Sequence, residues 1–336
     1  MALWLLPVLA VVAFGLTALV RRYALSRQLL DVPNARSSHV APTPRGGGVS
    51  IVLCFLGSVP LLVGAGGLTA AWGWALAGAG GGVALVGFLD DHGHIPARWR
   101  LLAHFAAAFW ALWLAAASMP LAVGGAWLGV GLSAFYLVWM LNLYNFMDGI
   151  DGIASVEAIT VCAGAALIYW LRGDAPAVLM PPLALAAAVA GFLVWNFPPA
   201  KIFMGDAGSG FLGIVLGVLS LQAGAVSPAL FWSWVILLGV FIVDATYTLL
   251  RRLLRGERVY EAHRSHAYQH ASRRFASHRT VTLGVVAINV LWLLPWAVAV
   301  GLGWVGAGTG LVLAYLPLAL VCRFFDAGAA ERVRPQ

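Results

Sequence analysis

The sequence contains little charge for its length. Of its 336 residues only 10% are charged, whereas 62% are hydrophobic, and a soluble domain usually carries about a quarter charged residues. A chain this apolar would aggregate in water, so we expect lipid to be its solvent. Its three cysteines stand far apart in apolar runs, without C-x-x-C or Cys/His spacing. Their scarcity and spacing argue against a disulfide framework and against a zinc site.

The sequence also lacks any sign of a second domain. No Pro/Ser-rich linker, long soluble tail or clear repeat interrupts it, so we expect a single transmembrane domain over residues 1–336. The net charge of +7 would suggest nucleic acid as a partner of a soluble protein. In a membrane protein it indicates orientation and attraction to anionic lipid, so we expect membrane lipid and no nucleic acid as partners.

Long apolar runs predict an all-α, polytopic membrane protein with about eleven spans. Each run has roughly twenty residues, which is enough to cross a bilayer core of about 30 Å. The gap at 67–69 is weak, so 47–89 is the region where the division is least marked. The expected spans are 3–20, 47–66, 70–89, 101–119, 125–141, 153–171, 178–195, 209–226, 229–250, 281–300 and 302–321.

Basic residues predict the orientation. Arg21 and Arg22 follow the first span and no basic residue precedes it, so we expect a membrane span and not a cleaved signal peptide. The amino terminus is then outside and the carboxyl terminus cytoplasmic. With this orientation 19 of the 20 Lys and Arg residues lie in cytoplasmic segments, and only Arg172 lies outside. These segments are 21–46, 90–100, 142–152, 196–208, 251–280 and 322–336.

Acidic residues gather on the same side. Asp174 alone of the 13 lies outside, and the rest lie at or near cytoplasmic ends of spans. An ionised carboxylate within hydrocarbon costs several kcal/mol, and transporters place such groups near mid-bilayer. A transporter or lipid-linked sugar flippase would show intramembrane charges in matched halves, and a structural anchor would show acids on both faces. The observed layer instead indicates a site that handles a water-soluble substrate at the membrane surface.

The first acidic motif is Asp90-Asp91 at the end of the third span. Adjacent carboxylates repel each other and favour a cation or a shared proton. The alternative is a pair of helix-end residues that face water. Because the motif ends an uncharged span and is one of several acidic clusters on this face, we favour a functional role.

The second motif has a polar residue at every third position: Asn142, Asn145, Asp148 and Asp151. Residues three apart are neighbours on a helix, so this spacing predicts one polar stripe. The glycines between them allow close approach of backbone or ligand. An Asn/Asp/Gly turn between spans is the alternative.

The third motif runs from Asn196 to Ser209. In it, Pro198-Pro199 leads to Asp206, which is flanked by glycines where a span begins. Helix starts present free N–H groups that favour phosphate. Asp206 could bring Mg²⁺ to the same place, because this ion takes few carboxylates and shares substrate phosphate oxygens. The alternative is Asp206 as a helix N-cap, and both roles are compatible.

The basic loop 251–280 contains Arg264 and His266, residue types that suit phosphate recognition. Most of its arginines are expected to be solvated charges that fix topology. Asp244 lies within span nine, and we expect a structural ion pair with Arg251 or Arg252.

The first cytoplasmic loop, 31–48, is proline-rich and ends in three glycines. The prolines predict an extended loop, and the glycines open the second span. His39 and Arg45 in this loop could meet a phosphate, although loop charges are usually only solvated.

These motifs, in this order, resemble those of the polyprenyl-phosphate N-acetylhexosamine-1-phosphate transferases, glycosyltransferase family 4. That family includes the phospho-N-acetylmuramoyl-pentapeptide translocase and the enzymes that start O-antigen and teichoic-acid synthesis. The resemblance runs from Asp31 to about His270. It implies that Asp90 is the acid/base that deprotonates the lipid phosphate, and that Asp91 holds the metal or orients Asp90.

The resemblance also implies a donor site and a metal site. Asp206 would be the Mg²⁺ ligand, with Asn145 near the metal and Mn²⁺ as an alternative ion. Phe203 would stack on the base, and Asp148 and Asp151 would lie near uracil. The implied substrate-binding residues are Asn142, Asn145, Asp148, Asp151, Phe203, Arg264, His266, His39 and Arg45.

The implied reaction joins a UDP-N-acetylhexosamine to undecaprenyl phosphate, giving undecaprenyl-diphospho-sugar and UMP. The site would face the cytoplasm from a bacterial inner membrane, in an enzyme whose relatives often form homodimers. Direct in-line attack and a covalent two-step route both remain open.

Two departures from the family pattern bear on the substrate. The family's His-x-His-His motif reads His266-Ala267-Tyr268-Gln269 here, and Ser37 replaces a usual Lys. Both departures resemble the branch that begins O-antigen or lipopolysaccharide synthesis, and they count against a muramoyl-pentapeptide substrate. The sequence does not name the sugar.

Overall fold

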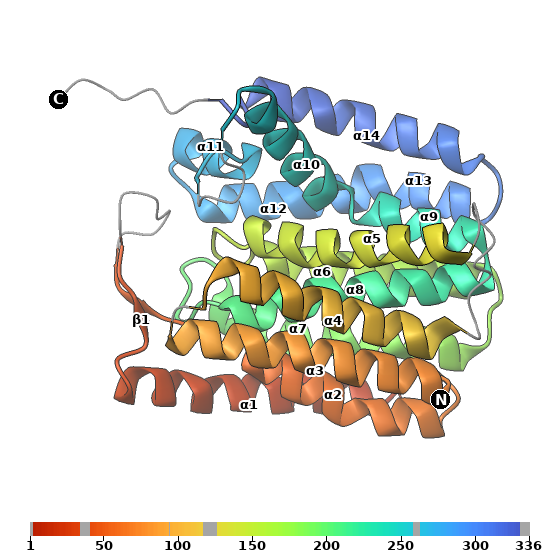
Figure 1. Ribbon diagram of the computed structural model, residues 1–336, viewed down its shortest axis with the longest axis horizontal. Helices are drawn as coiled ribbons and strands as arrows, with labels where there is room; N and C mark the ends of the chain where they lie inside the picture. The colour runs from red at the N-terminus through yellow and green to blue at the C-terminus, as the bar shows by residue number, and fades with distance from the viewer. Residues whose placement is uncertain (1–2, 34–40, 94, 117–125, 258–262, 330–336) are drawn as a thin grey trace.

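The computed structural model describes residues 3–33, 41–93, 95–116, 126–257 and 263–329. They form a bundle of long helices that run roughly side by side, with connecting loops at two ends (Figure 1). We call the end drawn at the left of Figure 1 the polar end. The β1–β2 strand pair and α11 lie there, α3 and α5 finish there, and α8 begins there.

Helices dominate the described chain. The first seven are α1 (Leu5–Ser26), α2 (Val49–Gly64), α3 (Ala70–His92), α4 (Ala97–Ala115), α5 (Ala126–Met147), α6 (Ile153–Leu171) and α7 (Met180–Asn196). They are followed by α8 (Asp206–Val226), α9 (Pro228–Leu237), α10 (Gly239–Leu254), α11 (Ala267–Phe275), α12 (His278–Ile288), α13 (Leu294–Gly301) and α14 (Ala307–Phe324). A 3₁₀ turn, η2 (Pro176–Leu179), precedes α7, and a π-helical turn, η3 (Asn289–Leu293), joins α12 to α13.

The helices confirm a multi-pass membrane protein. Eight spans in the described chain are long and apolar enough to cross a bilayer, and α9 with α10, bent by 71°, qualify together as a ninth. The predicted spans at α2 and α4 are helical but fall outside that set, so the count of eleven and the orientation stay predictions. The weak division at 67–69 is confirmed, because the Thr69 side chain caps α3 by accepting from the Trp72 N–H.

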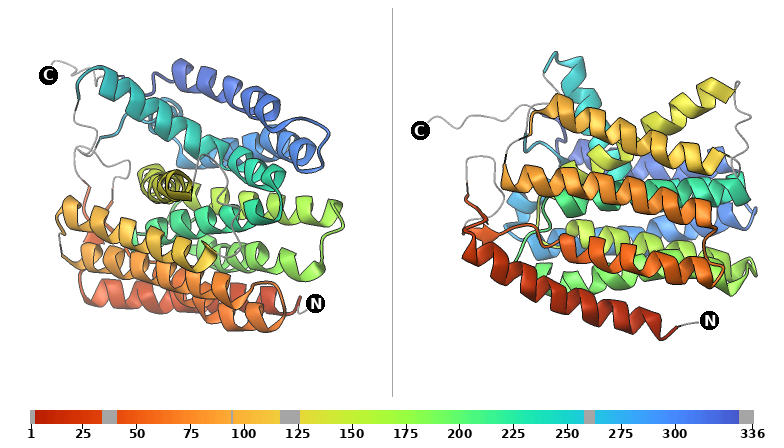
Figure 2. Two further views of the ribbon diagram at one scale, coloured as in Figure 1. Left: turned by 45° about the vertical axis from the view of Figure 1, so that its right-hand side comes forward. Right: turned by 60° about the horizontal axis from the view of Figure 1, so that its bottom comes forward.

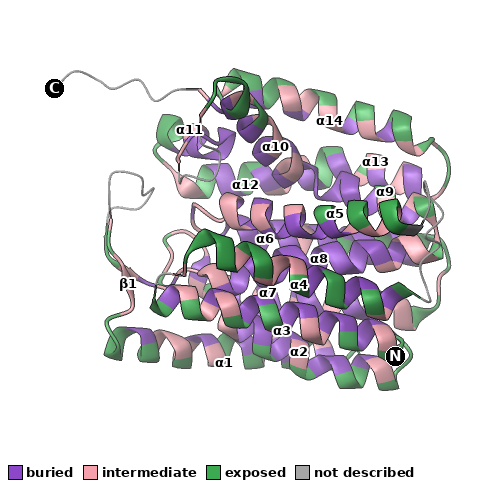
Figure 3. Cartoon of the chain, viewed as in Figure 1, coloured by how far each residue is buried: buried purple, intermediate pink, exposed green. Residues whose placement is uncertain are grey.

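Helix α8 lies at the centre of the bundle. Within its span 78% of residues are buried, against 22% for α1 and α14, which lie at opposite sides (Figure 3). Glycine permits the close approach, since a Cβ on Gly213 would lie 2.6 Å from the Leu141 Cα of α5. A Cβ on Gly87 of α3 would similarly lie 2.5 Å from the Asp206 backbone carbon. Such small residues let membrane helices pack backbone to backbone, and here they bring the ends of α3 and α5 to the start of α8.

The first loop contains a strand pair that the sequence analysis did not predict. β1 (Leu30–Asp31) pairs antiparallel with β2 (Thr43–Pro44) beside the end of α1, as the right-hand view of Figure 2 shows. The Pro44 carbonyl then accepts from the Phe203 N–H at 2.8 Å, and the Phe203 carbonyl accepts from the Gly47 N–H at 2.9 Å. The extended loop therefore lies along the segment that leads into α8.

One acidic residue is buried near the start of α6. Glu157 of α6 is fully buried, and its Oε2 accepts a hydrogen bond from the Asn289 side chain at 2.7 Å. The Asn289 Nδ2 is also 2.8 Å from the Thr160 hydroxyl. An asparagine from a neighbouring helical segment thus supplies the partner that burial of this carboxylate requires.

Candidate active site

Three charged side chains from three helices meet at the polar end. The Nη1 of Arg100, on α4, donates to Oδ2 of Asp90 and lies 3.2 Å from Oδ2 of Asp206. The other oxygen of Asp90 accepts from the Ile95 N–H at 2.7 Å. Two acidic motifs that are 116 positions apart in the chain are therefore bridged by one guanidinium.

Asp91 faces a different partner from its neighbour. Its buried carboxylate accepts from the backbone N–H groups of Asp206 at 3.3 Å and Ala207 at 3.4 Å. The N-cap of α8 is Gly205, with φ at +77°, and a Cβ there would lie 2.7 Å from the Asp91 carboxylate. Asp206 is therefore not the N-cap, and that alternative was wrong. Asp91 satisfies the free helix-start amides from outside the helix.

The polar stripe divides between a helix and a turn. Because α5 ends at Met147, Asn142 and Asn145 lie on the helix, whereas Asp148 and Asp151 lie in the connection to α6. The prediction of one continuous helical stripe was right for the first pair and wrong for the second. Gly152 has a left-handed backbone conformation, with φ at +75°, and it allows the chain to turn just before α6 begins.

The two asparagines have different partners. Asn142 donates from Nδ2 to the Val138 carbonyl of its own helix at 2.7 Å. Asn145 accepts from the Ser209 hydroxyl of α8 at 2.8 Å. Since Ser209 is three residues after Asp206, this hydrogen bond fastens the end of α5 to the start of α8.

Asp148 lies in a strongly negative setting. Burial raises the pKa of its carboxyl well above the ordinary value, and the charges of Asp206, Asp151 and Asp91 raise that pKa further. Within the described part of the chain, no hydrogen bond to its side chain is recorded. Carboxylates gathered in this way require a cation or a proton.

Asp151 and Asn196 hold the segment before α8. The Asp151 carboxylate accepts from the Ala200 N–H at 2.9 Å and lies 3.2 Å from Nδ1 of His278 on α12. The Asn196 side chain donates to the Ile202 carbonyl at 3.0 Å. These contacts give Asp151 an anchoring role, and its predicted contact with uracil stays a prediction.

The first loop brings one of its two candidates to the site. Arg45 donates from Nη2 to the backbone carbonyl of Asp91, while its Nε is buried with no hydrogen-bond partner among the described residues. Arg45 also lines an apolar cavity of about 260 Å³ between α1, α2 and α3. Phe203 is half-buried beside this loop. His39 lies outside the described residues.

The basic loop corrects the expected partner of Asp244. Its carboxylate accepts from the first backbone amides of α11 and lies 3.3 Å from Nδ1 of His266. Arg251 instead donates to a backbone carbonyl near the carboxyl terminus, and Arg252 to a glutamate. The free amides of a helix start suit a carboxylate better than flexible arginines of its own helix.

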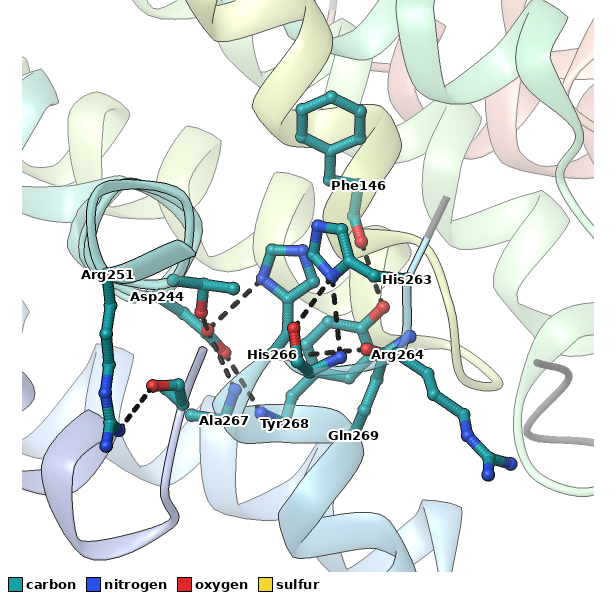
Figure 4. Close-up of polar contacts among 12 residues, drawn as sticks. Phe146, Asp244, Arg251, His263, Arg264, His266, Ala267, Tyr268 and Gln269 are labelled. Atoms are coloured by element: carbon teal, nitrogen blue, oxygen red, sulfur yellow. Dashed lines mark hydrogen bonds and ion pairs between the residues drawn. The ribbon is translucent and has the colours of Figure 1, made fainter. Parts of the chain in front are cut away.

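The two predicted substrate contacts of this loop lie differently. His266 is only 2% exposed, so in this structure it supports the loop and presents no open face to a substrate. The Arg264 side chain extends away from Asp244 and His266 (Figure 4).

The oxygen-rich donor set suits a hard cation. Among the described residues no three His, Cys, Asp or Glu side chains form a ready-made metal cluster. Mg²⁺ typically uses one or two carboxylates and completes its shell with water and substrate phosphates. Asp206 can supply such a carboxylate, and the repulsion between its charge and that of Asp148 favours a bound cation.

Three residues of this arrangement had no role assigned from the sequence: Arg100, Ser209 and Asn196, although the last two are the ends of the third motif. The signals were weak, because each is a common residue at a helix end. Arg100 follows Asp90 by ten positions, Ser209 follows Asp206 by three, and Asn196 opens the segment that leads to Asp206.

Comparison with known proteins agrees with this arrangement. Residues 73–224 match the model of glycosyl transferase family 4. The chain is 30% identical to a probable undecaprenyl-phosphate N-acetylglucosaminyl 1-phosphate transferase of Bacillus subtilis, covering 82% of this chain and 79% of that protein. It is 30% identical to the decaprenyl-phosphate N-acetylglucosaminephosphotransferase of Mycolicibacterium smegmatis, covering 92% and 86%. A phospho-N-acetylmuramoyl-pentapeptide-transferase of Streptococcus thermophilus is 37% identical, over only 39% and 38%.

These likenesses extend over most of the chain and of the first two relatives. They cover α3, α5 and the start of α8, which carry the acidic site. The expected resemblance is thus confirmed, and a transferase is favoured over a transporter or flippase. The chain belongs to glycosyl transferase family 4 and is one of the polyprenyl-phosphate hexosamine-1-phosphate transferases of the membrane.

Proposed function

We propose that this enzyme transfers N-acetylhexosamine 1-phosphate from a UDP-sugar to undecaprenyl phosphate, with Mg²⁺ as cofactor. The products are undecaprenyl-diphospho-sugar and UMP. The reaction takes place at the polar end, which faces the cytoplasm from a bacterial inner membrane. N-acetylglucosamine is the first sugar to test, because the names of the relatives from Bacillus subtilis and Mycolicibacterium smegmatis carry it.

One observation carries the proposal: acidic groups from separate helices converge at the polar end of the bundle. Arg100 joins Asp90 to Asp206, and Asp91 holds the amides at the start of α8. Phosphoryl transfer depends mainly on positioning and on neutralising charge, and an acidic site with a paired arginine suits a diphosphate whose charge a metal ion would offset.

The residues divide the chemistry between them. Asp90, oriented by the Ile95 N–H and by Arg100, keeps the acceptor phosphate deprotonated. Asp206 would hold Mg²⁺, which would supply positive charge to offset that of the diphosphate. Ser209 holds Asn145 near the start of α8. Arg100 offers positive charge to the departing UMP phosphate. Direct attack and a covalent aspartyl route are both compatible with this arrangement.

The acceptor phosphate has its own candidate partner. The Nε of Arg45 is buried and has no hydrogen-bond acceptor among the described residues. A phosphate oxygen is a suitable acceptor for that N–H. The cavity that Arg45 lines is mostly apolar, so it suits the isoprenoid chain of the acceptor lipid. We extend the proposal to the start of a surface polysaccharide of the O-antigen type, on the two departures from the family motifs.

The test uses purified protein in detergent with undecaprenyl phosphate, Mg²⁺ and a panel of UDP-N-acetylhexosamines, and it measures UMP release. We expect UMP only when lipid and Mg²⁺ are both present. EDTA and the Asp206→Ala variant should each abolish release.

Asp174→Ala serves as the matched control, because this carboxylate pairs with Arg172 on the connection between α6 and α7, away from the polar end. It should leave UMP release unchanged. No UMP from any donor with folded wild-type protein would overturn the proposed reaction. Full activity of Asp206→Ala would overturn the metal assignment.

A further inference from the structure

Helix α11 contacts both α10 and the end of α5. Oδ1 of Asp244, on α10, accepts from the Ala267 N–H at 2.9 Å, and Oδ2 accepts from the Tyr268 N–H at 3.0 Å. These are the first two amides of α11, which have no partners within the helix. The Gln269 side chain closes the start further by accepting from the His266 N–H at 3.2 Å. The orientation of α11 is therefore fixed from α10.

Tyr268 extends from this fixed helix start to α5. Its hydroxyl donates to the backbone carbonyl of Phe146 at 3.0 Å, and its side chain is buried (Figure 4). The carbonyl belongs to the last turn of α5, where such groups lack partners within the helix. Burial raises the pKa of the Tyr268 phenol well above its ordinary value, so the hydroxyl keeps its proton and remains a donor at neutral pH.

The following turn is shaped around the same side chain. A Cβ added to Gly149 would lie 2.1 Å from the Tyr268 hydroxyl oxygen and 3.2 Å from Nε2 of Gln269. Tyr268 thus occupies the space that a side chain at position 149 would need. In the sequence, Asp148 lies between Phe146 and Gly149, the two residues that Tyr268 contacts or crowds. Asn145 directly precedes Phe146, whose carbonyl accepts the hydrogen bond. A displaced Tyr268 would therefore move two of the polar groups that face the start of α8.

We infer that Tyr268 is a positioning residue for the nucleotide and metal site, held by Asp244 and acting through the last turn of α5. The inference rests on the proposed function, which makes Asn145 and Asp148 part of the donor site. It assigns a role to a position where this sequence departs from the His-x-His-His pattern of its family. The phenol supplies a donor that reaches a backbone carbonyl, and it does not contact the substrate.

The test compares Tyr268→Phe with wild type. Losing one neutral hydrogen bond should raise KM for the UDP-sugar and the half-saturating Mg²⁺ concentration by about three- to tenfold. KM for undecaprenyl phosphate should stay unchanged. Amide hydrogen exchange should become faster in the segment 145–152, a readout that does not depend on activity.

Gly149→Ala gives an independent variant, because its methyl group would clash with the Tyr268 hydroxyl. On its own it should raise the same two constants. In the double variant the missing hydroxyl relieves the clash, so the combined effect should be smaller than the sum of the single effects. Additive effects would overturn the inference, since they would mean that the two positions act separately.

Tyr136→Phe is the matched control. Tyr136 lies on the same helix, α5, and its hydroxyl is 2.8 Å from Ser220 of α8. We expect lower thermal stability with unchanged KM and unchanged Mg²⁺ dependence. Wild-type protein that releases no UMP would count against the proposed function. An active wild type with unaltered constants and exchange in Tyr268→Phe would overturn the inference alone.

Discussion

Two serines of α8 offer a paired test of how the site is held. Ser209 donates to Asn145 and Ser220 lies against Tyr136, and each of these hydroxyl contacts to α5 is 2.8 Å long. Each hydroxyl also reaches a carbonyl of its own helix region. The two contacts are chemically alike, but only the first lies at the polar end. Ser209→Ala and Ser220→Ala should therefore differ in function and not in stability.

The expected magnitude follows from the hydrogen bonds. Both serines are almost fully buried, and a buried neutral hydrogen bond contributes about 1 kcal/mol to the free energy of unfolding. Each variant should lose about that much. In Ser209→Ala the lost hydrogen bond no longer holds Asn145. A loss of about 1 kcal/mol corresponds to roughly fivefold weaker binding of Mg²⁺ or nucleotide.

The assay measures UMP release against Mg²⁺ and against UDP-sugar, together with thermal unfolding in detergent. We expect matched decreases in melting temperature, with a several-fold rise in half-saturating Mg²⁺ for Ser209→Ala only. Equal kinetic effects in both variants would mean that the helix contact, and not its place near Asp206, matters. Wild-type kinetics in Ser209→Ala would refute the positioning of Asn145 by α8.

Three further predictions concern charged groups. Arg100→Gln removes the cation that now bridges two carboxylates, so it should lower the half-saturating Mg²⁺ concentration while slowing turnover; a metal titration that shows no decrease would contradict this competition. Arg45→Leu should raise KM for undecaprenyl phosphate and leave KM for the UDP-sugar unchanged, as varied-lipid kinetics would show. Glu157→Gln should fold normally, whereas Glu157→Leu removes one of the two acceptors of the buried Asn289 amide and leaves only the Thr160 hydroxyl. The Leu variant should therefore cost about 1–3 kcal/mol in a thermal unfolding assay; a Leu variant as stable as wild type would refute that account.

Much of the fold could be predicted because a membrane imposes a simple length rule on apolar runs. Every predicted span overlaps a helix, and the Thr69 cap confirms the weakest division. The bend between α9 and α10 was not predicted, since the run around the break is apolar and a single glycine, Gly239, is a weak signal for a bend. The β1–β2 pair was also missed, because two-residue strands carry no periodicity.

The candidate site was predictable in its residues and less so in its contacts. Asp90, Asp206 and Asn145 were singled out from acidic and polar motifs. Their partners Arg100 and Ser209 were not, because a long-range contact depends on which helices pack together. Asp244 shows the same limit, since sequence favours an arginine nearby in the chain, whereas the structure supplies the amides of α11.

The Asp90-Asp91 pair shows why adjacency in sequence is a poor guide to shared function. Consecutive residues on an α-helix point about 100° apart, so two neighbouring carboxylates cannot both face one ligand equally. Here Asp91 turns inward to the amides at the start of α8, and Asp90 turns to Arg100. One carboxylate could not do both, because the amides are buried and the guanidinium is partly exposed. The pair therefore joins a carboxylate that holds the start of α8 to one that pairs with Arg100 and is the proposed acid/base.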